Sequence, residues 1–391
     1  MACKCRLCDK ENVELLINFG EQPIVHHLLK RRDETYDEFP FQLGYCPNCS
    51  FLQLLQPISA EILYENYFTI SAWKNQPHVE RLIDVMKSIT GMNKNSRLLE
   101  IGCNDGSFIE ILSKHGINNC IGIEPSNDAY QLALSKNIHV YNEFFSYQNS
   151  KLPLEKQHYD IIICRQVLEH ISNLEKFMMS VDYYLNNNGY FVIEVPDSNC
   201  QLKYMDYALW EEHVNYFTLH TLQNLLNKYD FEIFHYETTL FSGKAITIFA
   251  EKKAKKNNFH YKVEDLDQII SYGLQWPRFK EQAQEMVSSR NEVAIYGCGA
   301  RSSTFVNFLE LENVAFFIDD QKEKQKYFVP GRRLEIVSWD DHCSDGFFLL
   351  GVNTENEIKV INKRKLNARQ FASILPPSRH LPEFWKNMIC A

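Results

Sequence analysis

The 391-residue sequence predicts an α/β protein with two doubly wound parallel sheets and a small cysteine-containing module at its N-terminal end. Strand-like apolar runs alternate with helical stretches over residues 76–252, and the alternation begins again after residue 253, which is typical of such sheets. Two C-x₂-C pairs set residues 1–75 apart, and a polar, basic stretch at 252–258 favours a second boundary. We therefore expect three domains, over 1–75, 76–252 and 253–391, of which the last two are Rossmann-like.

The expected strands follow from short apolar runs bounded by turn residues. In the middle segment they lie at 97–101, 120–124, 138–141, 159–164 and 190–195, and an antiparallel pair follows at 232–236 and 245–250. In the third segment a long helix at 263–290 precedes strands at 292–296, 314–318 and 347–352.

Composition limits the classes of partner. Hydrophobic residues make up 45% of the chain, enough to build several cores, so extensive disorder is not expected. The net charge of -9 disfavours general binding of nucleic acid or of anionic membranes. We see no run of 18 apolar residues and no signal-peptide apolar region, so we expect no membrane span and a cytoplasmic location. The 12 cysteines are then expected as thiols or metal ligands and not as disulfides.

The two cysteine pairs predict a metal centre. Four thiolates suit tetrahedral zinc, and a two-residue gap lets one turn present both sulfur atoms to one ion. Four protein ligands close the coordination shell, so the zinc is expected to be structural. Cys3 is a competitor for the first position, and His26 and His27 are alternative ligands. The predicted ligands are Cys5, Cys8, Cys46 and Cys49.

The sequence L-L-E-I-G-C-N-D-G at 98–106 runs from an apolar strand into a helix. Its glycines let a ligand approach the backbone, and the start of the helix offers free N–H groups. Acidic groups here would repel a pyrophosphate but tolerate the sulfonium of S-adenosylmethionine, which is favoured over a dinucleotide with its G-x-G-x-x-G fingerprint. Glu124 ends the next strand, where a carboxylate suits the ribose hydroxyls. The pattern predicts a class I methyltransferase core, with Glu100, Gly102, Asn104, Gly106 and Glu124 binding the cofactor.

Two further pairs of residues are expected at the edge of the sheet where the cofactor loop lies. Phe144 and Phe145 follow the strand at 138–141 and are candidates to sandwich adenine, with packing in the core as an equal alternative. Gln166 and His170 are four residues apart, so on one helical turn they would share a face. That places Gln166 at the cofactor and His170 at the transferable methyl group, unless His170 caps a helix.

The segment W-E-E-H-V-N-Y-F-T at 210–218 is dense in titratable and aromatic residues. Since a carboxylate can orient an imidazole ring and raise its basicity, His213 beside Glu212 is a candidate general base. The alternative is a surface loop with a structural histidine.

Together these motifs resemble the bacterial nucleotide-sugar C-methyltransferases, which act on 4-keto deoxysugars. The resemblance covers essentially the whole chain and rests on an ordered set of motifs: the two C-x₂-C pairs, E-I-G-C-N-D-G at 100–106, G-I-E-P-S at 122–126, L-E-H-I at 168–171, E-H-V-N-Y-F at 212–217, and a glycine-containing loop at 297–303 followed by P-G at 330–331.

The resemblance implies that S-adenosylmethionine binds the middle domain and that the nucleotide-sugar lies between the middle and C-terminal domains. It assigns the base to His213, and it matches an N-terminal Y-x-x-x-S stretch to Tyr67, with Tyr64 as a competitor. One position departs from the family pattern. Trp210 stands where related sequences often have tyrosine, and an indole N–H donates a hydrogen bond but releases no proton.

The third domain carries a second strand-glycine-helix turn, A-I-Y-G-C-G-A-R-S-S at 294–303. Such a turn can hold a pyrophosphate, and its incomplete G-x-G pattern together with the resemblance favours a nucleotide-sugar over NAD. The predicted substrate-binding residues are Gly297, Gly299, Arg301, Ser302 and Asp320.

The chemistry follows from the residues. A carbon becomes nucleophilic when a base removes a proton beside a carbonyl group and a donor stabilises the resulting enolate. Combined with this chemistry, the resemblance implies C-methylation of a nucleotide-linked 4-keto-6-deoxysugar, at C3. O- or N-methylation of a related sugar and a non-catalytic scaffold are the alternatives, and the acidic charge opposes an RNA methyltransferase.

Overall fold

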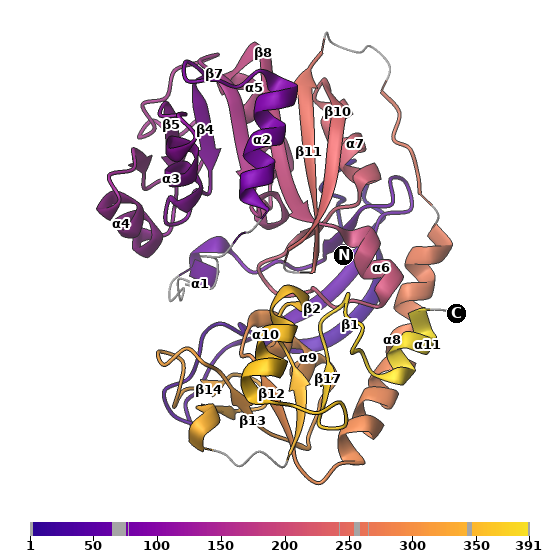
Figure 1. Cartoon of the computed structure of the whole chain (residues 1–391). Helices are drawn as coiled ribbons and strands as arrows, with labels where there is room; N and C mark the ends of the chain where they lie inside the picture. The colour runs from indigo at the N-terminus through magenta and orange to yellow at the C-terminus, as the bar shows by residue number, and fades with distance from the viewer. Residues whose placement is uncertain are drawn as a thin grey trace.

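The computed structural model describes residues 3–64, 76, 78–241, 243–253, 259–264, 266–341 and 346–389. Within these ranges the strands form three sheets (Figure 1). The seven-stranded sheet occupies the upper half of Figure 1 and the six-stranded sheet the lower half. No helix in the described ranges is long and apolar enough to cross a membrane.

The N-terminal sheet is antiparallel, with the strand order β1-β2-β3-β9. Its elements are β1 (Glu14–Pro23), β2 (Glu38–Tyr45), β3 (Leu52–Leu54) and, from far along the chain, β9 (Asn215–Tyr216), and a short helix α1 (Ala60–Tyr64) follows. Strand β9 belongs to the 210–218 segment, so one candidate catalytic motif is hydrogen-bonded into the N-terminal sheet.

The middle sheet has the order β10-β11-β8-β7-β4-β5-β6, and only β11 runs antiparallel to its neighbours. Its strands are β4 (Leu98–Ile101), β5 (Cys120–Ile123), β6 (Val140–Tyr141), β7 (Tyr159–Arg165), β8 (Leu185–Pro196), β10 (Phe231–Leu240) and β11 (Lys244–Lys252). The helices are α2 (Val79–Thr90), α3 (Ser107–Lys114), α4 (Asn127–Ser135), α5 (Leu174–Tyr184), α6 (Ser198–Tyr204) and α7 (Leu219–Lys228). The direction of strand addition reverses between β4 and β7, and ligands bind at the carboxyl ends of strands at such a point.

The C-terminal sheet has the order β14-β15-β13-β12-β16-β17 and is parallel except at β14. Its strands are β12 (Val293–Tyr296), β13 (Val314–Ile318), β14 (Phe328–Val329), β15 (Leu334–Val337), β16 (Phe347–Leu350) and β17 (Phe371–Ser373). The helices are α8 (Leu266–Ser288), α9 (Ala300–Phe308), α10 (Thr354–Arg364) and α11 (Glu383–Ile389). In this sheet the direction of strand addition reverses between β12 and β16. The glycine turn after β12 therefore occupies the same position in the C-terminal sheet as the loop after β4 does in the middle sheet.

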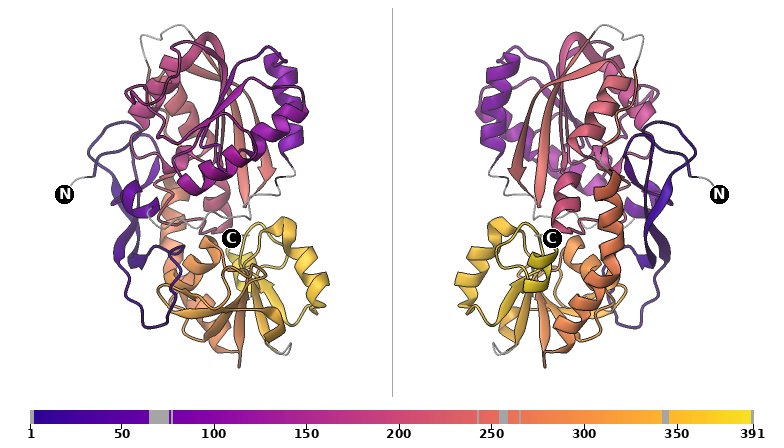
Figure 2. Two further views of the ribbon diagram at one scale, coloured as in Figure 1. Left: turned by 90° about the vertical axis from the view of Figure 1, so that its left-hand side faces the viewer. Right: turned by 90° about the vertical axis from the view of Figure 1, so that its right-hand side faces the viewer.

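The N-terminal segment packs against the domain of the seven-stranded sheet and against the domain of the six-stranded sheet. Figure 2 shows it along one edge of the molecule. Phe19 of β1 stacks on Phe308 of α9 with ring centroids 4.0 Å apart and meets Trp276 of α8 edge-on. The cysteine pairs share a second core with Phe217 and strands of the middle sheet. This double packing fixes the N-terminal sheet relative to both other sheets.

Candidate active site and metal centre

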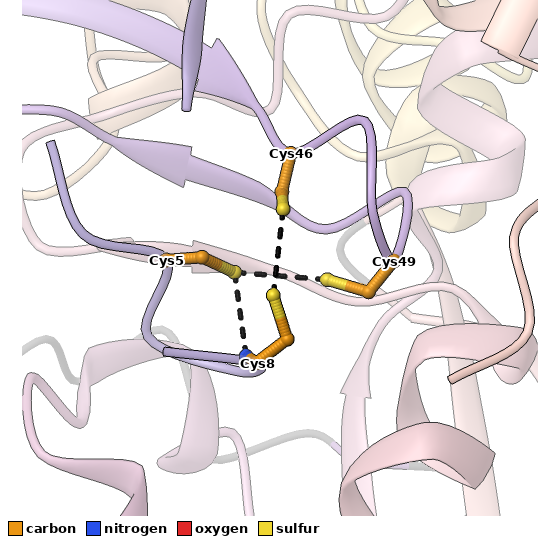
Figure 3. A group of neighbouring side chains, drawn as sticks. All are labelled: Cys5, Cys8, Cys46 and Cys49. Carbon is orange, nitrogen blue, oxygen red and sulfur yellow. Dashed lines mark hydrogen bonds between the residues drawn. The ribbon is translucent and has the colours of Figure 1, made fainter. Parts of the chain in front are cut away.

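The four cysteines of the two C-x₂-C pairs converge on one point (Figure 3). The Sγ atoms of Cys5 and Cys49 are 3.6 Å apart, and those of Cys8 and Cys46 are 3.5 Å apart. Tetrahedral zinc with Zn–S bonds of roughly 2.3 Å places sulfur atoms about 3.8 Å apart, so the donor set fits the ion. All four thiols are buried, as a closed structural site requires.

Matching turns present the two pairs. The N–H of Asp9 donates to the carbonyl of Cys5, and the N–H of Ser50 donates to the carbonyl of Cys46. Asp9 and Ser50 both adopt positive φ angles, 65° and 59°, which close each turn behind its second cysteine. Cys3 and the two histidines, the alternative ligands from the sequence, lie outside this cluster.

The loop after β4 has a backbone that glycine makes possible. Gly102 and Gly106 have φ angles of 68° and 72°, and a Cβ on Gly102 would fall 2.4 Å from Val167. The carboxylate of Glu124 accepts two backbone hydrogen bonds, from Asn104 N–H at 2.9 Å and from Ser126 N–H at 2.8 Å. Glu124 therefore ties the loop after β4 to the end of β5.

Glu100 is buried at the base of this loop. Burial raises the pKa of its carboxyl to about 8, although the nearby charge of Arg165 opposes the shift. Its Oε2 has no hydrogen-bond partner among the described residues. A positively charged ligand in the loop would find an acceptor there.

One cavity of about 170 Å³ joins most of the candidate catalytic and cofactor-binding residues, but none of the five predicted substrate-binding residues. It is lined by the loop after β4, by the turn after β7, by the 210–213 segment, and by Ala300 of the C-terminal domain. The predicted residues in this lining are Glu100, Gly102, Asn104, Gln166, His170, Trp210, Glu212 and His213. The structure therefore brings the L-E-H-I and E-H-V-N motifs to the glycine loop.

The turn after β7 differs from the helical turn expected there. Gln166 has a φ of 54° and lies outside any helix, and a single 3₁₀ turn, η2 (Leu168–His170), follows it. The prediction that Gln166 and His170 share one helical face is wrong, because the backbone reverses at Gln166 before the turn begins. Both side chains still line the cavity.

The two candidate catalytic motifs are joined directly. His170 Nδ1 lies 2.9 Å from the carbonyl oxygen of Glu212, and the N–H of Val214 donates to the carbonyl of Glu169 at 2.9 Å. The Asn215 amide also donates to the carbonyls of Leu168 and Ile171. These contacts fix the ring of His170 and the backbone around His213.

His213 is buried against Trp210, with the two ring centroids 3.7 Å apart. Burial, together with His170 and Arg301, holds the pKa of His213 well below its usual range. Within the described ranges no group hydrogen-bonds to its imidazole. A neutral ring with an unused nitrogen at a cavity is able to accept a proton from a ligand.

The glutamates before His213 contact the N-terminal domain. His26 Nδ1 lies 3.2 Å from Glu211, and its Nε2 lies 3.6 Å from Glu212. Burial lowers the pKa of His26, but the hydrogen bond to Glu211 and the charges of both glutamates dominate and raise it to about 9. Sequence reasoning considered His26 only as a zinc ligand and missed this contact, which no local motif announces.

Other predicted residues take different positions. Phe144 is 56% exposed, whereas Phe145 packs against Phe177 and Tyr184, which is the core-packing alternative. Tyr67 lies outside the described residues, as does the side chain of Tyr64.

The turn after β12 is held by its own side chains. The hydroxyl of Ser302 donates to the carbonyl of Gly297 at 2.6 Å and accepts from the N–H of Gly299. Asp319 accepts from the N–H of Cys298 at 2.8 Å, in the same way that Glu124 accepts from Asn104.

Two charged residues predicted to bind substrate are already paired. Arg301 Nη2 lies 2.6 and 2.8 Å from the carboxylate oxygens of Asp206, a buried contact between the C-terminal and middle domains. Its Nε and Nη1 are buried without a described hydrogen-bond partner. Asp320 pairs with Lys363 and Arg364 at 2.7 and 2.6 Å.

A larger cavity, of about 990 Å³, lies between the N-terminal loop, Tyr327 of the C-terminal domain and the start of α4. It reaches His26 and Ser126, so it adjoins both the Glu211–Glu212 pair and the end of β5.

Three family models match the chain. The model described as "Putative zinc binding domain" matches residues 5–64, "Methyltransferase domain" matches 73–236, and "C-methyltransferase C-terminal domain" matches 260–376.

Individual proteins similar to this chain include the following. C-methyltransferase NovU of Streptomyces niveus is 23% identical and covers 96% of both chains. The ubiquinone biosynthesis O-methyltransferase of Rickettsia bellii is 26% identical over 120 residues, which are 30% of this chain and 50% of that protein. Among solved structures, a SAM dependent methyltransferase from Archaeoglobus fulgidus aligns with 50% of this chain and all of its own, at 17% identity and a TM-score of 0.38.

Proposed function

We propose that this chain, a member of the S-adenosylmethionine-dependent C-methyltransferases, methylates a nucleotide-linked 4-keto-6-deoxysugar at C3, next to the ketone. The observation that carries the proposal is His213, a buried and unprotonated imidazole whose ring nitrogens are unused by the described residues and which lines the same cavity as the cofactor loop. Methylation of carbon requires such a base.

S-adenosylmethionine supplies an electrophilic methyl group on a sulfonium. We assign its binding to the loop after β4 and to Glu124, whose orientation is set by Asn104 and Ser126. Glu100 at the base of the loop is the acceptor for the cationic end of the cofactor. A sulfonium or ammonium nearby would favour the ionised carboxylate there, against the effect of burial.

His213 removes the proton from the sugar carbon beside the ketone, and the resulting enolate carbon attacks the methyl group. Trp210 packs against the His213 ring and fixes its orientation beside the cavity. His170 lies 4.9 Å away, ring centroid to centroid, and its Nδ1 is occupied by the Glu212 carbonyl, so only its Nε2 is available to the substrate.

The nucleotide is assigned to the turn after β12. The first turn of α9 offers backbone N–H groups to a diphosphate, whereas the N–H groups of Gly297 and Gly299 are already bonded to Ile318 and Ser302. Nothing would contact a Cβ at Gly299, so the turn is open at that point. The buried Nε and Nη1 of Arg301 are further donors for the same anion. The zinc centre is structural and holds the N-terminal sheet that carries β9.

The test is to incubate the purified chain with S-adenosylmethionine and a panel of nucleotide-linked 4-keto-6-deoxysugars, and to read products by mass and NMR. The proposal predicts a gain of one methyl group on carbon, with retention of the ketone. A methyl group on oxygen or nitrogen would favour the O- or N-methyltransferase alternative, to which the match of the middle domain to O-methyltransferases points. Absence of cofactor binding by calorimetry would favour a non-catalytic scaffold.

A further inference from the structure

Glu169 lies in the 3₁₀ turn after β7 and is 1% exposed, yet it is one of the residues that line the cavity with His213. Both carboxyl oxygens are buried, and neither has a hydrogen-bond partner among the described residues. A buried carboxyl group without partners is destabilising unless a ligand satisfies it, so such groups mark functional sites.

The contrast with Glu194 on β8 is direct. Glu194 is equally buried, but His78 lies 3.0 Å and Arg165 lies 3.4 Å from its carboxylate. Although burial raises the pKa of Glu194, these partners lower it to about 2, so Glu194 is ionised. Among the residues that the structure describes, no lysine or arginine forms an ion pair with Glu169.

The groups facing Glu169 are Glu194 from β8, Glu212 from the 210–213 segment, and the rings of His170 and His213. Burial is the main cause that raises the pKa of Glu169, the backbone N–H of Glu169 itself opposes the shift, and the charges of the two glutamates add to it, giving a value of about 8. The carboxyl is therefore mostly protonated at neutral pH. A neutral acid in an apolar site is a strong hydrogen-bond donor to a developing oxyanion.

The geometry brings this acid to the proposed base. One oxygen of Glu169, one nitrogen of His170 and one nitrogen of His213 all lie within 4.8 Å of one another, and His170 Nε2 is 3.9 Å from Glu169 Oε1. A ketone and its adjacent carbon span one bond, so a substrate placed between Glu169 and His213 presents its oxygen to one and its C–H to the other.

We propose that Glu169 is a catalytic acid that donates its O–H to the ketone oxygen of the substrate while His213 removes the proton from the adjacent carbon. The inference rests on the proposed function. His213 takes the C–H proton, and the electron pair of that bond forms the enolate, whose oxygen is held by Glu169. The C–C bond then forms as the methyl–sulfur bond breaks, and S-adenosylhomocysteine leaves. The ketone is restored, Glu169 keeps its proton, and imidazolium His213 releases its proton to water.

This role supplies a function that Trp210 cannot perform. An indole N–H at that position cannot release a proton, and the carboxyl of Glu169, from the same cavity, supplies the hydrogen-bond donor to the enolate oxygen.

The experiment compares wild type with Glu169→Ala and Glu169→Gln, using Glu175→Gln, an exposed position on α5, as the matched control. For each we would measure kcat/KM for the nucleotide-sugar from pH 6 to 10 at saturating S-adenosylmethionine, exchange of the C–H proton with D₂O, and cofactor affinity. Saturating cofactor is needed because Glu100 also has a pKa near 8.

Loss of an oxyanion donor lowers turnover about 100- to 1,000-fold. We expect that loss in Glu169→Ala, together with slower exchange and unchanged cofactor affinity. Glu169→Gln retains a donor that does not titrate, so it should be less impaired than Ala and lack the fall in kcat/KM above pH 8 seen in wild type and in Glu175→Gln.

Wild-type exchange and turnover in Glu169→Ala would overturn the role of Glu169 while leaving the proposed function intact. Absence of carbon methylation by wild type would instead overturn the proposed function. The same three groups also suit a divalent cation, so turnover is measured with EDTA and with Mg²⁺ or Mn²⁺ added back, while zinc content is monitored. If turnover requires the added metal and Glu169→Gln abolishes it, Glu169 is a metal ligand and not a hydrogen-bond donor to the substrate.

Discussion

His170 Nδ1 lies 2.9 Å from the backbone carbonyl oxygen of Glu212, so the histidine after β7 is oriented by the residue that precedes the proposed base. A carbonyl only accepts, and the proton of the neutral ring therefore sits on Nδ1. Burial is the main cause that lowers the pKa of His170 to about 4, and the contact leaves Nε2 as a lone-pair nitrogen at the cavity. The relationship couples two motifs that are some forty residues apart in the sequence.

The first prediction separates the two histidines. His213→Asn should lower kcat by about 100- to 10,000-fold, the range for loss of a general base, and leave cofactor affinity within about threefold of wild type. His170→Asn should lower kcat less, since it removes an orienting group and not the base. Steady-state kinetics and calorimetry make the comparison, with the exposed His139→Gln as control. Near wild-type turnover in His213→Asn would move the base to another residue.

The second prediction concerns Glu124. Glu124→Ala removes the acceptor for two backbone N–H groups and the proposed ribose ligand, and hydrogen bonds to a charged group contribute about 1.5–3 kcal/mol. We expect the Kd for S-adenosylmethionine to rise by about 10- to 100-fold. Glu110→Gln, on α3 beside the same loop, should leave the Kd unchanged in calorimetry. An unaltered Kd in Glu124→Ala would show that the ribose is held elsewhere.

The third prediction is a pH dependence of stability. The pKa of His26 is about 9 in the folded chain and about 6.5 in the unfolded chain. A raised pKa contributes stability that is complete below pH 6.5 and is lost as the pH rises through 9. The free energy of unfolding of wild type should exceed that of His26→Gln by up to about 3 kcal/mol at pH 6, and the difference should vanish near pH 10.

Urea denaturation at several pH values checks this. Glu100 and Glu169 titrate in the same range, but they are present in both proteins and cancel in the difference. A difference that does not change with pH would contradict the ion pairs of His26 with Glu211 and Glu212.

The fourth prediction concerns the zinc centre. Cys46→Ser should lower bound zinc well below one ion per chain and reduce the free energy of unfolding by about 4 kcal/mol or more, as expected when a structural metal is lost. Cys3→Ser should keep one zinc, because Cys3 lies outside the cluster. Metal analysis and thermal unfolding give the two values, and full zinc content in Cys46→Ser would contradict the site.

The sequence predicted those helices, strands and turns that depend on short-range residue patterns. The expected strands all appear with their ends shifted by a few residues, and the helix expected at 263–290 is α8 (Leu266–Ser288), which continues through Pro277. The cysteine turns and the glycine loop were also predictable, because two-residue spacing and positive φ angles leave direct marks on the sequence. The same alternation predicted the two doubly wound, mostly parallel sheets, whereas the order of their strands comes from the structure.

Contacts between distant segments were not predictable. β9 is two residues long and joins the N-terminal sheet only because β3 is there to pair with it. His26 reaches Glu211 across 185 positions, and Arg301 reaches Asp206 across a domain boundary. The 3₁₀ turn at Leu168–His170 was mistaken for α-helix, since the i to i+4 spacing of Gln166 and His170 says nothing about the positive φ at Gln166.

The most direct test of the account is exchange of the proton on the carbon beside the ketone. A nucleotide-linked 4-keto-6-deoxysugar is incubated in D₂O with the protein, with and without S-adenosylhomocysteine in the cofactor site, and followed by NMR. Enolate formation by His213 predicts deuterium at the carbon that becomes methylated, at a rate that His213→Asn reduces at least about 100-fold. Methyl transfer without any exchange, or exchange that survives unchanged in His213→Asn, would contradict enolate formation by this base.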